Sequence, residues 1–188
     1  MKNVYFITSN KGKVHEVKTK LEPLGYKIIQ KDLGYPEIQT DSLEEVAQFG
    51  VKQIQKAGID HPFILEDAGI FIDALKGFPG VYSSYVYHSI GLDGILELMK
   101  KIVSMEKRAS QFRSVFAYGI PEGEMETFIG TCNGRIATEK IGKKGFGYDP
   151  IFIPNGFNTT FAEMNTEDKN KISHRGRSLE KLISFLKK

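Results

Sequence analysis

The sequence has a single cysteine, no long run of apolar residues, and no repeated or low-complexity segment. Cys132 on its own cannot form an internal disulfide, and no cluster of Cys and His residues with metal-site spacing accompanies it. A disulfide scaffold and a zinc module are therefore excluded. Nothing in the sequence has the pattern of a membrane span or of a secretory leader. We expect a cytoplasmic protein that has no membrane partner.

The sequence also lacks a large excess of positive or negative residues, because its net charge is only +3. A nucleic-acid-binding domain usually concentrates Lys and Arg on one face, whereas here they are spread along the whole chain. Nucleic acid is therefore not an expected partner, although salt-sensitive retention on DNA or RNA would reverse that expectation. A mild basic excess suits a small anionic ligand.

The chain does contain ordinary proportions of hydrophobic (40%) and charged (26%) residues over its 188 positions. Such a chain forms one domain, residues 1–188, or two closely joined lobes. Strand patterns occur at residues 2–8, 26–31, 63–65, 70–72, 111–119 and 125–131, and helical patterns at 12–24, 42–57, 91–104 and from 173 onward. Loops are expected at residues 32–41, 76–83 and 142–150. Because helices and strands alternate first and strands cluster later, the prediction is α/β: a mixed β-sheet with flanking helices, in two lobes with a central cleft.

The turn after the first predicted strand reads TSNKGK, residues 8–13, and leads directly into a helical pattern. Backbone N–H groups at the start of a helix, together with the helix dipole, favour an anion there. Lys13 adds a mobile positive charge. The turn is neither a Walker A loop nor a dinucleotide fingerprint. The alternative is an ordinary helix start in which Ser9 or Asn10 caps the helix and the lysines face water.

Acidic residues stand at the end of the strand predicted over residues 63–65. Side chains alternate across a sheet, so one of Glu66 and Asp67 can point toward a ligand while the other points away. A carboxylate at a strand end beside phosphates is a usual ligand of Mg²⁺, which takes one or two carboxylates together with substrate phosphates. Glu37, on the loop after the second strand, can supply a second carboxylate. The alternatives are a solvated turn and an exposed loop acid.

Two later segments combine aromatic and cationic residues. The loop GFGYDP, residues 145–150, can form a stacking surface with an adjacent carboxylate, although packing of its aromatic rings into the core is the commoner use of such residues. Ser173 is placed to cap the C-terminal helix, which leaves His174 and Arg175 in the first turn. Cations there oppose the helix dipole, and this favours a functional role over a tolerated exposed pair. Lys169 adds positive charge one turn earlier.

Taken in order, these segments resemble the inosine/xanthosine triphosphate pyrophosphatase (ITPase-like) family. Residues 8–13 match its T/S-x-N-x-x-K pattern, and residues 65–69 match its acidic strand end. Residues 146–150 match its F-G-Y/W-D-P loop, and residues 173–175 match its S-H-R element. The resemblance implies Mg²⁺-dependent hydrolysis of ITP, dITP and XTP to the nucleoside monophosphate and pyrophosphate. It also implies an elongated two-lobed fold and a homodimer.

The resemblance also implies a role for individual residues. Asp67 is expected to be the catalytic proton acceptor and a metal ligand, and Glu37 the second metal ligand. The expected substrate-binding residues are Thr8, Ser9, Asn10, Lys11, Gly12, Lys13, Ala68, Phe146, Gly147, Tyr148, Asp149, Lys169, His174 and Arg175.

The sequence departs from the family pattern after Pro79-Gly80. Many bacterial members read Y-S-A-R there, whereas Tyr82-Ser83-Ser84-Tyr85 lacks the arginine. If that arginine contacts phosphate in relatives, this chain supplies the charge elsewhere. Two other functions stay open at this point: a pyrophosphatase for modified pyrimidine nucleotides on a related fold, and a nucleotide sensor that releases no pyrophosphate.

Overall fold

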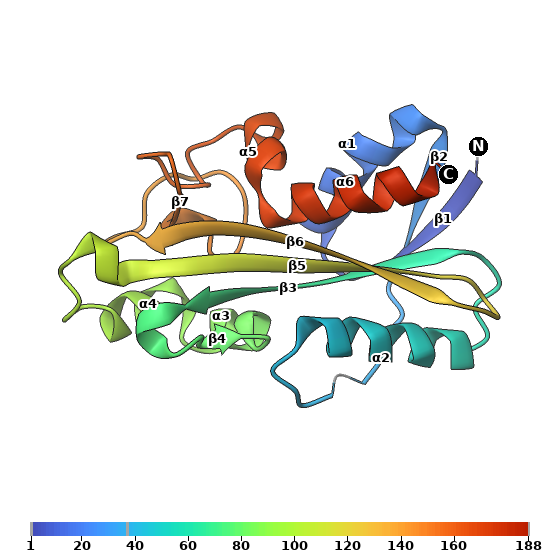
Figure 1. The fold of residues 1–188 in the computed structure, drawn as a ribbon, viewed down its shortest axis with the longest axis horizontal. Helices are drawn as coiled ribbons and strands as arrows, with labels where there is room; N and C mark the ends of the chain where they lie inside the picture. Colours follow the sequence, from blue (N-terminus) through green and yellow to red (C-terminus); the bar gives the residue numbers. More distant parts are fainter. Residues whose placement is uncertain (1, 37, 188) are drawn as a thin grey trace. The chain divides into compact units, whose positions relative to one another are not determined.

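The computed structural model describes residues 2–36 and 38–187, and in them a seven-stranded mixed sheet forms (Figure 1). The strand order is β2-β1-β3-β5-β6-β7, with β4 paired to β3. β1 is parallel to β2 and to β3, whereas β3–β4 and β6–β7 are antiparallel. The strands are β1 Lys2–Ile7, β2 Tyr26–Lys31, β3 Phe63–Ile72, β4 Pro79–Gly80, β5 Ala109–Gly119, β6 Met125–Ile136 and β7 Phe152–Pro154. The predicted mixed α/β fold is confirmed.

Six α-helices are present in the same described residues. They are α1 Lys11–Leu21, α2 Leu43–Lys56, α3 Ser83–Ser89, α4 Gly91–Leu98, α5 Thr166–Ile172 and α6 His174–Leu186. Short 3-10 segments lie at Glu22–Leu24, Asp73–Leu75, Met105–Arg108 and Asp149–Ile151. Within the described ranges, no helix has the length and apolar character needed to cross a bilayer.

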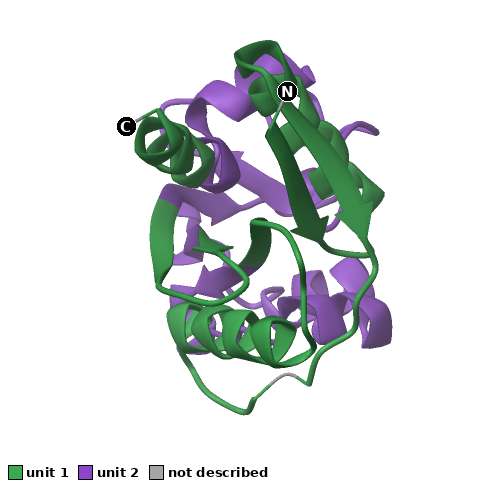
Figure 2. Cartoon of the chain, turned by 90° about the vertical axis from the view of Figure 1, so that its right-hand side faces the viewer, with its two compact units in different colours: residues 1–67, 114–130, 177–188 green, residues 68–113, 131–176 purple. Residues whose placement is uncertain are grey.

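The chain divides into two compact units, coloured separately in Figure 2. Unit 1 comprises residues 1–67, 114–130 and 177–188, and unit 2 comprises residues 68–113 and 131–176. Each unit has its own cluster of buried apolar side chains.

Unit 1 is built around β1, β2 and the first half of β3. Val4, Phe6 and Ile64 point to one face of these strands and pack with α1 and with Leu179 and Leu182 of α6. The helix α2 lies on the opposite face (Figure 1). Its amphipathic pattern buries Leu43, Val46, Ala47, Val51 and Ile54. Burying a side chain of this size contributes roughly 1.5–3 kcal/mol, so these two layers account for much of the stability of unit 1.

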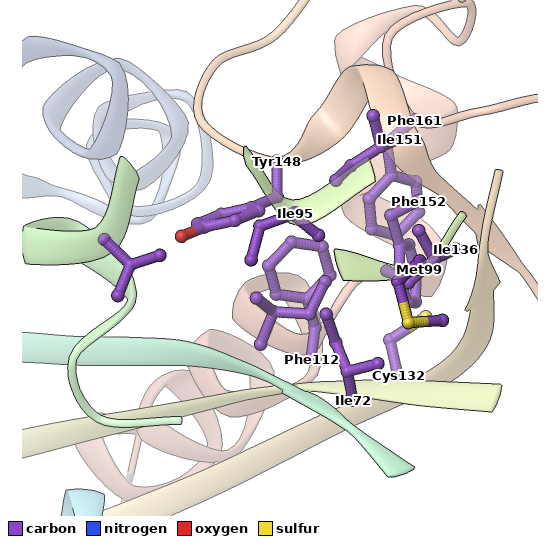
Figure 3. Close-up of a cluster of buried hydrophobic side chains, with 12 residues drawn as sticks. Ile72, Ile95, Met99, Phe112, Cys132, Ile136, Tyr148, Ile151, Phe152 and Phe161 are labelled. Carbon is purple, nitrogen blue, oxygen red and sulfur yellow. The ribbon is translucent and has the colours of Figure 1, made fainter. Parts of the chain in front are cut away.

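Unit 2 has a core made of aromatic and branched side chains (Figure 3). Phe112 of β5 lies against Phe152 and Phe161, with ring centroids 4.6 and 6.1 Å away. Met99 and Cys132 fill the same cluster. The single cysteine of the chain, Cys132, is buried in this core.

Two sequence predictions need correction. The helix expected over residues 91–104 ends at Leu98, because the carbonyl groups of Met99 and Ile102 accept hydrogen bonds from the Arg108 side chain. The loop expected over residues 76–83 contains β4 and the first residue of α3. The strand predicted over residues 63–65, with residues 70–72 expected to continue extended, runs without interruption as the single strand β3.

Candidate functional site

The turn TSNKGK in unit 1 is a capped helix start. The Asn10 side-chain oxygen accepts hydrogen bonds from the N–H groups of Gly12 (2.9 Å) and Lys13 (3.2 Å). The Thr8 hydroxyl oxygen accepts a bond from the N–H of Asn10. The cap predicted as an alternative is therefore present, and of its two candidates the structure selects Asn10. Ser9, Asn10 and Lys11 are exposed at this end of α1.

Lys13 does not face water, in contrast to the cap interpretation. Its Nζ lies 2.7 Å from the Glu66 carboxylate and donates to the Glu66 carbonyl oxygen at 2.9 Å. The Glu66 side chain is fully buried, whereas 18% of the Lys13 side chain is exposed. A buried carboxylate is costly unless a cation and hydrogen bonds compensate it, so the two residues depend on each other.

Two serines complete this cluster in unit 1. The Ser114 hydroxyl donates to Glu66 Oε1 at 2.7 Å, and it lies 2.9 Å from the Ser178 hydroxyl. Both serines are fully buried. Ser114 and Ser178 are candidates that the sequence patterns did not indicate, and Glu66 was indicated only as one member of an acidic pair. The only local signal was the acidic pair at the strand end, and it pointed to Asp67 as strongly as to Glu66.

Asp67 follows Glu66 on β3 and is half-buried. Because side chains alternate along a strand, Asp67 points to the opposite side of β3 from Glu66, and its catalytic and metal-binding role stays a prediction. Glu37, predicted as the second metal ligand, lies outside the described residues. In residues 2–36 and 38–187, no group of three or more His, Cys, Asp or Glu side chains is arranged to hold a metal ion.

The aromatic loop of unit 2 is organised by a buried ion pair. Asp149 accepts a hydrogen bond from the backbone N–H of Phe146 at 2.8 Å, and Lys169 Nζ lies 2.7 Å from the same oxygen. Both side chains are almost completely buried. Gly145 has φ +73°, and a side chain there would collide with the Asp149 carboxylate, so this turn requires glycine.

The two aromatic rings of this loop have different environments. Tyr148 lies in the unit 2 core, and its hydroxyl donates to the carbonyl oxygen of Ser83 at 2.8 Å (Figure 3). Burial, and to a smaller extent the neighbouring Tyr87, raises the pKa of Tyr148 well above its ordinary value. The core packing foreseen as the alternative therefore applies to Tyr148. Phe146 and Gly147 are half-buried, so the core-packing alternative does not extend to the whole loop.

Two cations flank the Phe146 ring. Lys169 Nζ lies 4.8 Å, and the guanidinium carbon of Arg175 5.2 Å, from its centroid. Ser173 caps α6 by accepting a bond from Gly176 N–H, which confirms that His174 and Arg175 occupy the first turn. Contrary to the exposed alternative, both are buried, and His174 stacks on Phe112 at 4.4 Å.

A separate hollow of about 670 Å³ lies in unit 1, beside the C-terminal end of α2. Tyr5, Lys31, Tyr35, Lys56 and Asp60 are among its lining residues. As far as the described chain goes, the lining includes none of the predicted site residues.

In this α/β protein, unit 1 has a lysine-bearing turn of the kind that suits an anion, and unit 2 has an aromatic ring flanked by cations. The Ham1 family model matches residues 4–185, and the chain belongs to this family. The dITP/XTP pyrophosphatase of Thermococcus kodakarensis is 53% identical over 182 residues, which are 97% of this chain and 96% of that protein. The dITP/XTP pyrophosphatase of Pyrococcus horikoshii is 51% identical over 98% of this chain and 96% of its own.

Solved structures agree with the family assignment. The Staphylococcus aureus Ham1 protein has a TM-score of 0.83 and 32% identity, over 99% of this chain and 98% of that one. The HAM1 protein from Coxiella burnetii also has a TM-score of 0.83, with 30% identity over 100% of this chain and 99% of its own.

Proposed function

We propose that this chain hydrolyses dITP, XTP and ITP to the nucleoside monophosphate and pyrophosphate. The observation that carries the proposal is identity of 51–53% to two dITP/XTP pyrophosphatases over nearly the whole chain, and each cluster described above suits the same reaction. Nothing among the observations favours a pyrimidine pyrophosphatase or a sensor.

The unit 1 cluster is assigned to the triphosphate. Lys13 donates to a phosphate oxygen, and the polar groups of residues 8–12 add donors at the exposed end of α1. Asp67 orients a water molecule and accepts its proton as the water attacks the α-phosphorus. Pyrophosphate then leaves in line, and the charge that develops on oxygen is met by donors already in place.

The unit 2 cluster is assigned to the base. The Phe146 ring supplies a stacking surface, and Arg175 is a donor-only group beside it. Hypoxanthine and xanthine present a 6-keto acceptor to such donors, whereas adenine presents a 6-amino donor. Facing a donor with a donor leaves a buried hydrogen bond unmade, which costs about 1–3 kcal/mol and explains why ATP is rejected.

The proposed reaction uses Mg²⁺. Asp67 follows Glu66, the partner of Lys13, on β3, and its carboxylate is a hard oxygen ligand. Mg²⁺ needs only one or two such carboxylates when phosphates complete its shell. Glu37 is proposed as the second ligand. When bound, the metal neutralises charge on the phosphate oxygens.

The remaining assignments are that residues 1–188 form a single catalytic domain, that the protein is cytoplasmic, and that it is a homodimer. The nucleotide pool is where dITP and XTP would be removed. Exposed aromatic side chains at Phe78, Tyr82 and Tyr85 provide an apolar surface of the kind that interfaces cover. Analytical ultracentrifugation of the wild type and of Tyr85→Glu tests the dimer, and a monomeric wild type would refute it.

A pyrophosphate-release screen tests the proposed function. Purified protein is assayed with dITP, XTP, ITP, ATP, GTP and methylated pyrimidine triphosphates, with and without Mg²⁺. We expect Mg²⁺-dependent release from the first three. Asp67→Asn should abolish release while nucleotide binding, measured by calorimetry, is largely retained. Preferred turnover of methylated pyrimidine triphosphates would favour a pyrophosphatase for modified pyrimidine nucleotides. Binding of ITP by the wild type without release of pyrophosphate would favour a nucleotide sensor.

A further inference from the structure

Lys13 is held by a residue to which no motif gave a role in the reaction. Its Nζ forms an ion pair with the Glu66 carboxylate (2.7 Å) and donates a hydrogen bond to the Glu66 backbone carbonyl oxygen (2.9 Å). Two contacts with one residue therefore fix the position of the ammonium group.

The Glu66 carboxylate is itself fixed from the interior of unit 1. Ser114 on β5 uses its single proton to donate to Glu66 Oε1. Because a hydroxyl has only one proton, the bond of 2.9 Å between the two serines has Ser178 of α6 as its donor. The chain of bonds therefore runs from Ser178 to Ser114 to Glu66, and Lys13 meets Glu66 from the other side.

We infer that Glu66 is a positioning residue for Lys13, and that Ser114 and Ser178 hold Glu66 in the required rotamer. The inference rests on the proposed function, in which Lys13 contacts the triphosphate. A free lysine side chain loses rotamer freedom when it binds a phosphate, whereas a lysine already held by Glu66 has lost that freedom before substrate arrives. Glu66 thereby improves triphosphate binding without touching the substrate.

A double-mutant cycle tests the coupling. Pyrophosphate release from dITP is measured at saturating Mg²⁺ for the wild type, Lys13→Met, Glu66→Gln and the double variant. Each single variant should lower kcat/KM by about tenfold to a hundredfold, the range expected for a hydrogen bond to a charged group. The kcat/KM of the double variant should equal that of the less active single variant, within about threefold. If the two losses multiply, Glu66 does not act through Lys13 and the inference is overturned.

Milder variants protect the test from a folding failure. Ser114→Ala keeps the Lys13–Glu66 pair and should lower kcat/KM by about threefold to tenfold, mainly through a higher KM. Ser110→Ala is the matched control, because Ser110 is buried on the same strand and no motif or cluster involves it. Glu66→Asp, which keeps the negative charge, should recover part of the activity lost in Glu66→Gln.

The outcomes separate this inference from the proposed function. If the wild-type protein releases no pyrophosphate from dITP, both the proposed function and the positioning role of Glu66 are refuted. The positioning role alone would be refuted if the wild type is active and Ser114→Ala has the same kinetic constants as Ser110→Ala. It would also be refuted if Ser114→Ala lowers kcat while its KM stays at the wild-type value.

Discussion

At the scale of single residues, buried polar groups carry most of the chemistry of this chain. Arg175 is 3% exposed, yet it stands in the first turn of α6, where the helix dipole opposes a cation. Its placement beside the Phe146 ring offsets part of that cost, since a desolvated cation over an aromatic ring gains about 1–2 kcal/mol. The same placement puts a donor-only group next to the proposed base.

Arg175→Ala should therefore narrow the preference for ITP over ATP. We expect the ratio of their kcat/KM values to fall by about tenfold or more, because the mismatch that penalises the 6-amino group is removed. Steady-state kinetics with both nucleotides measure the ratio. Arg177→Ala, two positions further along α6 at an exposed site, is the control and should leave the ratio unchanged. If Arg175→Ala keeps the wild-type ratio of kcat/KM for ITP and ATP, Arg175 does not take part in base recognition.

Tyr148 makes a second prediction, about alkaline stability. Burial raises the pKa of its phenol above the value of about 10 that the unfolded chain would have. Its stabilising contribution is therefore complete below pH 10 and is lost as pH rises above 10 toward the folded pKa. We expect the free energy of unfolding of the wild type to fall between pH 8 and pH 10.5.

Tyr148→Phe should weaken that dependence on pH. The variant also loses the hydrogen bond to the Ser83 carbonyl, so at pH 8 it should be less stable by about 1 kcal/mol. Urea unfolding followed by circular dichroism at both pH values measures both effects. Tyr85→Phe is the matched control, because the Tyr85 side chain is 74% exposed. An equally steep decline in Tyr148→Phe and the wild type would contradict the prediction.

Among the helices and strands, the sequence predicted those whose ends are marked by residues close by in the sequence. Ser42, the first residue of the helical pattern predicted over residues 42–57, caps α2 by accepting a hydrogen bond from Glu45 N–H. The end of α4 was not predictable in this way, because it depends on a side chain nine residues beyond Met99 in sequence. Both β7 and α3 are too short to produce a clear periodic pattern, with three and seven residues.

The same reasoning explains the candidate site. Motif spacing singled out Asn10, Lys13, Asp67 and Arg175 as candidates, because each lies at the start of a helix or in an acidic pair. Ser114 is 48 positions from Glu66, so no local pattern could pair the two. The tertiary fold creates that contact, and the structure was needed to find it.

Arg108 holds two elements of unit 2 together and gives the third prediction. Its guanidinium donates to the carbonyl oxygens of Met99, Ile102, Ile136 and Ala137, and it is 2% exposed. Burial lowers its pKa from the ordinary value. Since no carboxylate is among these four bonds, the cation is compensated there by carbonyl groups alone.

Arg108→Lys should lower the free energy of unfolding by about 3 kcal/mol, because an ammonium group cannot reproduce four bonds in a planar fork. Urea unfolding gives the value. Arg113→Lys is the control, since Arg113 is exposed and packs over the Phe71 ring at 4.1 Å, a contact worth about 0.5–1 kcal/mol at such a site. An equal decrease in the free energy of unfolding of the two variants would show that the four hydrogen bonds of the buried Arg108 guanidinium do not add to stability.

At the scale of the whole molecule, the two units are not separable segments of chain. The chain passes from one unit to the other after residues 67, 113, 130 and 176. These four positions lie within β3, β5, β6 and α6 respectively, and none lies in a loop. Unfolding one unit would therefore interrupt the pairing of three strands and separate the first turn of α6 from the rest of the helix.

We expect the chain to unfold in a single cooperative transition. Arg108→Lys perturbs unit 2, and Leu179→Ala removes a buried side chain from the unit 1 cluster, at a cost of about 2–5 kcal/mol. Because the interrupted strands belong to both units, each variant should lower amide protection in both by the same amount. Hydrogen exchange read at Phe116 in unit 1 and at Phe152 in unit 2 measures this. A variant that lowers protection only in its own unit would show that the units unfold independently despite their shared strands.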